Sequence, residues 1–159
     1  MRYRIVSTCE RPDLAVTTAT WRWSGFFRER GVPVEEVIRY ERDHLVAGSP
    51  MLRTLVLLAE GEPVGMVSLL SNDLEGRPDL GPWLGDLFVD ARFRGCGHAL
   101  RLIAALEASA RAEGVERLWL YTEDAAGLYR KAGWSEVEAA VSGGKPVRVL
   151  YRDLEREGP

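Results

Sequence analysis

The chain has 159 residues, of which 46% are hydrophobic and 28% charged, and a formal net charge of -3. This composition is ordinary for a globular protein, and the length predicts one domain over residues 1–159. The acidic balance argues against nucleic acid as the main partner, because phosphate backbones bind basic surfaces. Apolar runs fall well short of the ~20 residues that span a bilayer, and the first residues lack the apolar core of a signal peptide. We therefore expect a cytoplasmic protein with no membrane partner.

The N-terminal part is predicted to form one short strand and two helices. Residues 3–6 favour a strand, and residues 12–27 favour a helix that is rich in aromatic side chains and breaks at Gly25. Pro33 fits the first turn of a second helix. The side chains spaced three or four residues apart in that helix are Val34, Val37, Ile38, Glu41 and Leu45.

A hairpin, a loop and a third strand are predicted next. Residues 53–59 and 64–70 have strand-forming sequences, and residues 60–63 between them, Glu-Gly-Glu-Pro, are typical of a hairpin turn. Residues 71–82 are polar and rich in glycine and proline, which predicts a loop. The apolar residues 83–89 then predict another strand.

A glycine-rich turn at residues 90–99 joins this strand to a predicted helix that ends at Gly114. Such a turn leaves backbone N–H groups unpaired, and the helix dipole adds partial positive charge at the same place. The turn therefore predicts a site for a phosphate or pyrophosphate. It does not match the dinucleotide-binding motif, which needs a third glycine and a distant acidic residue, or the Gly-Lys-Ser/Thr of a phosphate loop.

The C-terminal part is predicted to complete a mixed α+β fold. Residues 116–121 favour a strand, and Thr122 is expected to cap a short helix that has residues 123–124 in its first turn. Residues 134–141 and 146–153 favour two final strands. Cys9 and Cys96 lie far apart, without the spacing of a metal site, so we expect no metal.

Two segments resemble motifs of the GCN5-related N-acetyltransferase (GNAT) superfamily. Residues 94–99, Arg-Gly-Cys-Gly-His-Ala, resemble its Arg/Gln-x-x-Gly-x-Gly/Ala signature. Residues 125–134 resemble its Ala-x-x-Leu-Tyr-x-x-x-Gly-Phe segment. The two segments follow the family's order at about its spacing. The resemblance implies a mostly antiparallel, twisted sheet that is flanked by helices and splayed at the strand before the glycine turn.

The resemblance also implies direct transfer of an acetyl group from acetyl-CoA, the cosubstrate, to an amine. Pantetheine would bind along the edge of residues 87–89, the pyrophosphate would rest on the amides of residues 95–99, and a backbone N–H of Leu87 or Phe88 would stabilise the oxyanion. The cofactor-binding residues that it implies are Leu87, Phe88, Val89, Arg94, Gly95, Cys96, Gly97, His98, Ala99, Thr122 and Tyr129.

Two residues are candidates for proton transfer. The resemblance implies Tyr129 as the acid that protonates the leaving thiolate. An alkylammonium has a pKa of about 10, so a base must remove its proton, and Asp86 is our candidate. Its strand is similar to that of polyamine-type acetyltransferases, which carry an acidic pair, although Gly85 replaces the first acid here. As alternatives, Tyr129 is a core tyrosine, and Asp86 forms a cap or pairs with an arginine.

The acceptor amine is not fixed by the motifs. We expect a primary amine of a small molecule, and the alternatives are a protein or peptide amine and a non-catalytic CoA-binding sensor of the same fold. The aromatic side chains of the first helix either wall the acceptor site or pack in the core; they are Trp21, Trp23, Phe26 and Phe27. A homodimer is an option by analogy.

Overall fold

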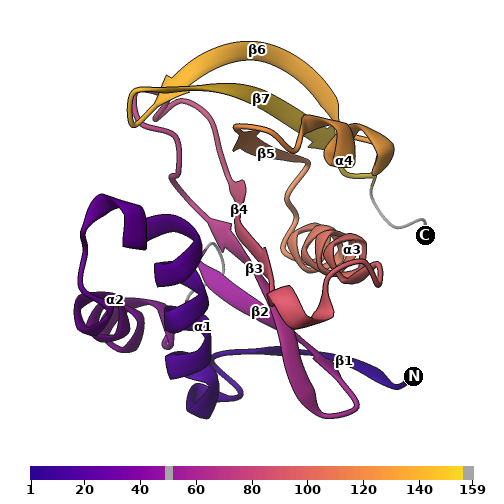
Figure 1. Ribbon diagram of the computed structural model, residues 1–159. Helices are drawn as coiled ribbons and strands as arrows, with labels where there is room; N and C mark the ends of the chain where they lie inside the picture. The colour runs from indigo at the N-terminus through magenta and orange to yellow at the C-terminus, as the bar shows by residue number, and fades with distance from the viewer. Residues whose placement is uncertain (49–51, 156–159) are drawn as a thin grey trace. The chain divides into compact units, whose positions relative to one another are not determined.

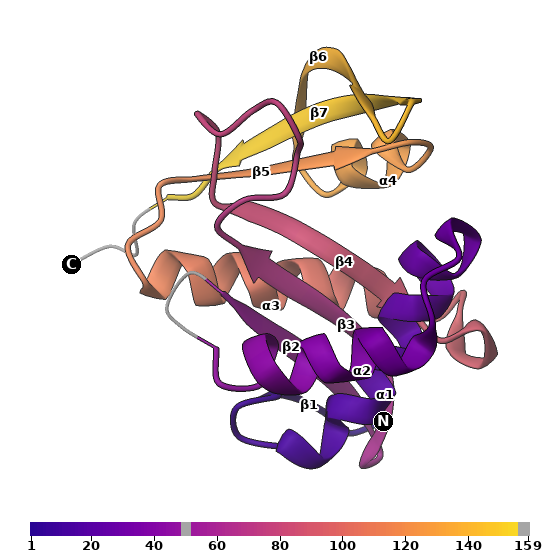
Figure 2. The ribbon, with the colours of Figure 1, turned by 90° about the vertical axis from the view of Figure 1, so that its left-hand side faces the viewer.

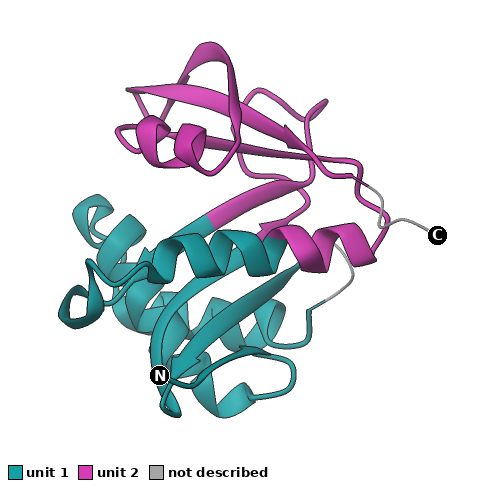
Figure 3. Cartoon of the chain, turned by 90° about the vertical axis from the view of Figure 1, so that its right-hand side faces the viewer, with its two compact units in different colours: residues 1–68, 86–106 teal, residues 69–85, 107–159 magenta. Residues whose placement is uncertain are grey.

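The computed structural model describes residues 1–48 and 52–155. They fall into two compact units, coloured separately in Figure 3. Unit 1 comprises residues 1–68 and 86–106, and unit 2 comprises residues 69–85 and 107–159. The single domain over residues 1–159 stays a prediction, and it extends over residues 49–51 and 156–159, which lie outside the described residues.

The helices and strands are labelled in Figure 1. In chain order they are β1 (Tyr3–Ser7), α1 (Ala15–Arg22), α2 (Val34–Tyr40), β2 (Arg53–Ala59), β3 (Glu62–Leu70), β4 (Trp83–Val89), α3 (His98–Ala112), β5 (Arg117–Thr122), α4 (Ala126–Lys131), β6 (Ser135–Ser142) and β7 (Lys145–Asp153). Among the described residues, no helix is long and apolar enough to cross a membrane.

The strands are hydrogen-bonded in the order β1-β2-β3-β4-β5-β7-β6. The β1–β2, β5–β7 and β6–β7 pairs are antiparallel, and the β4–β5 pair is parallel. Within the described residues, the register of the parallel pair places Trp83 opposite Trp119. This topology confirms the predicted mixed fold with a mostly antiparallel sheet flanked by helices, and the splay at the strand before the glycine turn stays a prediction.

Unit 1 has helices on both faces of its strands. Figures 1 and 2 show α1 and α2 on one face of β2 and β3, and the N-terminal part of α3 on the other. This part of α3 buries Leu102, Ile103 and Leu106, as the helical spacing predicts. The buried cluster on the strand side of α1 contains Val6, Leu14, Trp21, Val56, Leu58 and Met66.

The predicted helix over residues 12–27 is helical but not uniform. A 3₁₀ turn at Pro12–Leu14 precedes α1, and a π-helical turn at Trp23–Phe27 follows it. The predicted break at Gly25 is wrong, because Gly25 lies inside the π-helical turn. Its role is close packing: a Cβ at Gly25 would lie 2.9 Å from Cδ2 of Phe88.

Two turns of unit 1 also differ from the prediction. Pro33 is the residue before α2, with extended backbone (ψ 144°), rather than part of its first turn. The β2–β3 hairpin turns at Glu60 and Gly61, which have φ values of 51° and 79°. A two-residue turn with both φ values positive matches the twist of the strands, so β3 starts earlier than predicted and includes Pro63.

Unit 2 contains β5, β7, β6, α4 and the start of β4. Trp83 is buried there with Leu74, Val147 and Val149. Helix α4 begins at Ala126 with Ala125 as its N-cap residue, so the predicted cap at Thr122 is wrong, and residues 123–124 precede the helix. The Thr122 hydroxyl instead accepts a hydrogen bond of 3.0 Å from the N–H of Ala125 and closes the turn before α4.

Candidate active site

The turn between β4 and α3 presents a row of backbone donors. Asp90 follows β4, and its carboxylate accepts a hydrogen bond of 3.0 Å from the N–H of Arg92, which closes a 3₁₀ turn. Gly95 and Gly97 have φ values of 81° and 79°, a left-handed conformation that glycine adopts without strain. A Cβ at either glycine would have no neighbour within 4 Å, so glycine is needed there for its backbone conformation and not for lack of space.

The N–H groups of residues 95–99 donate to no acceptor in the part of the chain that the structure describes. They stand at the N-terminus of α3, which has 15 residues. The helix dipole and these donors favour an anion at this place, and the anion site that the glycine pattern indicates stays a prediction.

The side chains of this turn have different surroundings. The Nε of Arg94 donates to the carbonyl of Val89 at 3.0 Å, and its guanidinium lies over the ring of Phe88 at 5.8 Å. Cys96 is exposed. His98 is buried, with its ring edge-to-face with Tyr3 at 5.7 Å. His98 is therefore a residue that packs at the start of a helix.

Phe88 is packed from several sides within unit 1. Its ring stacks on Trp21 with 6.0 Å between centroids, and Gly25 lies against its edge. The indole N–H of Trp21 reaches the carboxylate of Asp90 at 3.4 Å. Trp21 is thus a core residue that holds β4, whereas Phe26 is exposed. This packing fixes the backbone at Phe88, one of the two candidate oxyanion donors.

Asp86, the predicted base, has an unusual backbone and a charged partner. Its φ is 52°, in the left-handed region that Asp tolerates better than most residues. Its side chain is 21% exposed, and Oδ2 accepts a hydrogen bond of 3.0 Å from Nε of Arg22. Oδ1 has no hydrogen-bond partner among the described residues.

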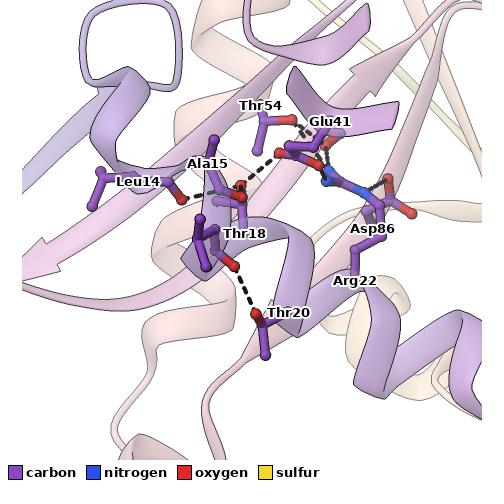
Figure 4. A network of polar contacts seen from close by, with 10 residues as sticks. Leu14, Ala15, Thr18, Thr20, Arg22, Glu41, Thr54 and Asp86 are labelled. Atoms are coloured by element: carbon purple, nitrogen blue, oxygen red, sulfur yellow. Dashed lines mark hydrogen bonds and ion pairs between the residues drawn. The ribbon is translucent and has the colours of Figure 1, made fainter. Parts of the chain in front are cut away.

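Arg22 belongs to a buried polar network that the sequence analysis missed (Figure 4). Its guanidinium also bonds Glu41, Thr54 at 3.3 Å and Ser68 at 3.0 Å. Burial lowers the pKa of Arg22, but the charges of Asp86 and Glu41 outweigh burial and raise that pKa above its ordinary value. Arg22 is therefore a permanent cation. The one signal in the sequence was Glu41, an acidic residue at an apolar position of its helix.

Tyr129 and Thr122 belong to unit 2. Tyr129 is 6% exposed, and its ring is edge-to-face with Trp134 at 6.0 Å. Burial raises the pKa of Tyr129 well above its ordinary value, so the phenol stays protonated at neutral pH. Its hydroxyl makes no hydrogen bond to any residue that the structure describes. Among the described residues there is also no group of three His, Cys, Asp or Glu side chains that could hold a metal.

The candidate residues divide between the two units. Asp86, residues 87–89 and residues 94–99 lie in unit 1, and Thr122 and Tyr129 lie in unit 2. Within unit 1, the anchored Asp86, the packed Phe88 and the glycine turn follow one another along 14 consecutive residues, 86–99. The meeting of Asp86 and Tyr129 at one thioester stays a prediction.

Comparison with solved structures finds the same fold in proteins of distant sequence. An aminoglycoside 6'-acetyltransferase type Ii matches with a TM-score of 0.73 and 18% identity, over 99% of this chain and 100% of that chain. An aminoglycoside 6'-N-acetyltransferase complexed with coenzyme A matches with a TM-score of 0.73 and 15% identity, over 100% of both chains. An N-acetyltransferase from Staphylococcus aureus Mu50 matches with a TM-score of 0.70 and 16% identity, over 98% of this chain and 100% of that chain.

The sequence has no significant match among curated proteins. It does match the family model described as "Acetyltransferase (GNAT) family" over residues 16–134, a range that holds both motifs and the whole Arg22–Glu41–Asp86 network. The predicted family, the acetyltransferase activity and the acetyl-CoA cosubstrate are thereby confirmed. On this match and on the geometry of its glycine turn, the chain belongs to the GNAT family of acetyltransferases.

Proposed function

We propose that this acetyltransferase moves the acetyl group of acetyl-CoA to a primary amine of a small molecule. The observation that carries the proposal is the set of free N–H groups at residues 95–99, at the start of α3. A diphosphate bound there gains several charge-assisted hydrogen bonds without displacing any bond within the protein. Glycine at positions 95 and 97 lets the ligand approach the backbone closely.

The reacting end of the cosubstrate would lie along β4. Pantetheine would add amide hydrogen bonds at residues 87–89, with Thr122 beside its arm, and a backbone N–H of Leu87 or Phe88 would stabilise the oxyanion. The packing of Phe88 between Trp21 and Gly25 supports this assignment, because an oxyanion donor must be fixed before the reaction.

Three proton transfers accompany acetyl transfer. Oδ1 of Asp86 takes one proton from the acceptor ammonium, and the neutral amine then attacks the thioester carbonyl and forms the N–C bond. The C–S bond breaks, the thiolate takes the proton of the Tyr129 hydroxyl, and the second proton that the nitrogen loses as it becomes an amide restores that hydroxyl by way of solvent. The unused hydroxyl of Tyr129 and its raised pKa support this role, since a phenol that stays protonated can donate to a thiolate.

A small-molecule acceptor is favoured over a protein or peptide amine by the comparisons. Two of the similar structures are named for acetylation of aminoglycosides, which are small molecules. The Tyr129 hydroxyl bonds no described residue, which disfavours a non-catalytic sensor. A sensor would gain nothing from a buried hydroxyl that is left without a partner. Cytoplasmic location and a homodimer stay predictions.

The experiment measures release of coenzyme A from acetyl-CoA with a panel of small amines, peptides and proteins, and identifies the acetylated product by mass spectrometry. We expect turnover with small amines. Tyr129→Phe should lower kcat about a hundredfold while the affinity for coenzyme A stays unchanged, because the variant loses only the acid. Turnover only with peptides or proteins would show that the acceptor is a protein or peptide amine and not a small molecule. Binding of coenzyme A without any turnover would favour the sensor.

A further inference from the structure

The side chain of Arg22 uses all three of its nitrogens in distinct directions. Figure 4 shows Nε facing Asp86 and the Nη atoms facing Glu41 and Thr54, and Nη2 also donates to the hydroxyl of Ser68. The arginine is 3% exposed, so water does not compete for these donors. A guanidinium held in this way has one orientation, and its Nε–H bond fixes the position of the Asp86 carboxylate.

Glu41 serves as the buried counter-charge of this arginine. It is fully buried, and its second oxygen accepts a hydrogen bond of 2.5 Å from the hydroxyl of Thr18. Glu41 comes directly after α2 and Arg22 ends α1, and a π-helical turn follows each of these helices. π-Helical turns often occur at functional sites. The two side chains therefore meet where both helices depart from regular α geometry.

The charges of the network do not balance. One arginine faces two carboxylates, so the network carries one excess negative charge. Glu41 is closed off from solvent, whereas Asp86 is partly exposed, and its Oδ1 bonds none of the residues that the structure describes. Because Glu41 already neutralises the charge of Arg22, the excess negative charge lies on Asp86, where a ligand can reach it.

Stability alone is a weak explanation for this arrangement. A buried ion pair gives little net stability, because removing both charges from water offsets most of their attraction. The left-handed backbone at Asp86 adds strain within β4. Strain and buried charge at the same place are typical of a site built for chemistry.

We propose that Arg22, with Glu41 as its buried counter-charge, is a positioning residue that fixes Oδ2 of Asp86 and leaves Oδ1 free to take the proton of the acceptor amine. This inference rests on the proposed function. The proton moves from the ammonium nitrogen to Oδ1, and the electron pair of that N–H bond stays on the nitrogen that attacks the thioester.

The first test compares three variants in steady-state transfer. Arg22→Lys keeps the charge but cannot bond Asp86, Glu41 and the hydroxyls at once, so kcat should fall about a hundredfold with KM for acetyl-CoA unchanged. Glu41→Gln keeps the shape of the side chain and should also lower kcat. Arg11→Lys is the matched control, since Arg11 pairs with Asp13 on the surface, and its kcat should equal that of the wild type.

The second test is spectroscopic and needs no turnover. The Nε–Hε signal of Arg22 in a ¹H–¹⁵N spectrum should be protected from exchange in the wild type, and it should shift in Asp86→Asn. A signal that is insensitive to Asp86→Asn would overturn the positioning role.

The outcomes separate the inference from the proposed function. Wild-type kcat in folded Arg22→Lys, or in folded Glu41→Gln if the former does not fold, defeats the inference while acetyl transfer stands. A rise in KM for acetyl-CoA as large as the fall in kcat would also defeat the inference. Such a rise would show that Arg22 supports the folding of unit 1 as a whole and not the position of Asp86 in particular. A wild type that acetylates no amine defeats the proposed function, and the role of Asp86 as base with it.

Discussion

Asp86 has a strained backbone conformation, and its carboxylate is held through one of its two oxygens. A positive φ costs a non-glycine residue about 1–2 kcal/mol, and Asp and Asn carry this cost best because their short polar side chains bond locally. The bond from Arg22 keeps the side chain in place. Conformation and charge at this position can therefore be tested separately by substitution.

The first prediction compares Asp86→Asn with Asp86→Ala. Asn tolerates the left-handed backbone and can still accept the Nε–H bond of Arg22, whereas Ala does neither. We expect the free energy of unfolding to be about 1–2 kcal/mol lower for Asp86→Ala than for Asp86→Asn, measured by urea denaturation. Acetyl transfer should be lost in both variants. Equal stability of the two variants would show that the backbone at this position is relaxed.

The second prediction concerns Tyr129 and pH. An unfolded chain ionises tyrosine near pH 10, roughly, while burial raises the pKa of Tyr129 in the folded protein. As pH rises above about 10, the unfolded state loses this proton first, so the free energy of unfolding falls by up to about 1.4 kcal/mol per pH unit. Below that pH the contribution is constant.

Denaturation of the wild type and of Tyr129→Phe between pH 8 and 11, roughly, isolates this effect from other titrating groups. The wild type should lose stability more steeply than the variant above about pH 10. Parallel curves would place the Tyr129 hydroxyl in water.

At the scale of elements, the turn before α3 depends on the backbone of Gly97. Its φ is 79°, and a Cβ there would meet open space. Substitution therefore changes conformation without causing a clash. Gly127 in α4 offers the matched case, because a Cβ there also meets open space and its φ is not positive.

The third prediction follows from this pair. Gly97→Ala should lower the free energy of unfolding by about 1 kcal/mol, because alanine is strained at a positive φ. It should also weaken binding of coenzyme A, because a distorted turn displaces the N–H groups that bind the diphosphate. Gly127→Ala should raise the free energy of unfolding by about 0.5–1 kcal/mol, as alanine does in a helix, and leave binding unchanged. Thermal unfolding and calorimetric titration with coenzyme A measure both effects. The same sign of stability change in both variants would contradict the assignment of the turn.

For the molecule as a whole, the sequence predicts the strands and the family well, because both depend on local patterns. The start of β4 at Trp83 and the positions of the two glycines follow from apolar runs and turn residues that are close in sequence. The Arg22 network is different. It joins residues that are 19 and 64 positions apart, and no local pattern pairs a given arginine with a given carboxylate.

The predicted break at Gly25 and the predicted helix cap at Thr122 are wrong for the same reason. Gly25 is glycine because the ring of Phe88 approaches it, and Thr122 bonds Ala125 instead of starting α4. In each case a tertiary or turn contact decides between structures that the local sequence allows equally. The sequence correctly places Asp86 in a strand, β4, and its role as base stays a prediction, but its anchor Arg22 could be seen only in three dimensions.

The proposed function depends most on the prediction that the backbone donors around Gly97, in unit 1, bind a diphosphate. The most direct test is a crystal structure of the protein with coenzyme A. We predict that the diphosphate oxygens accept hydrogen bonds from N–H groups of residues 95–99, with the thiol end running along residues 87–89. A complex in which coenzyme A binds elsewhere, while these N–H groups face water, would contradict the account.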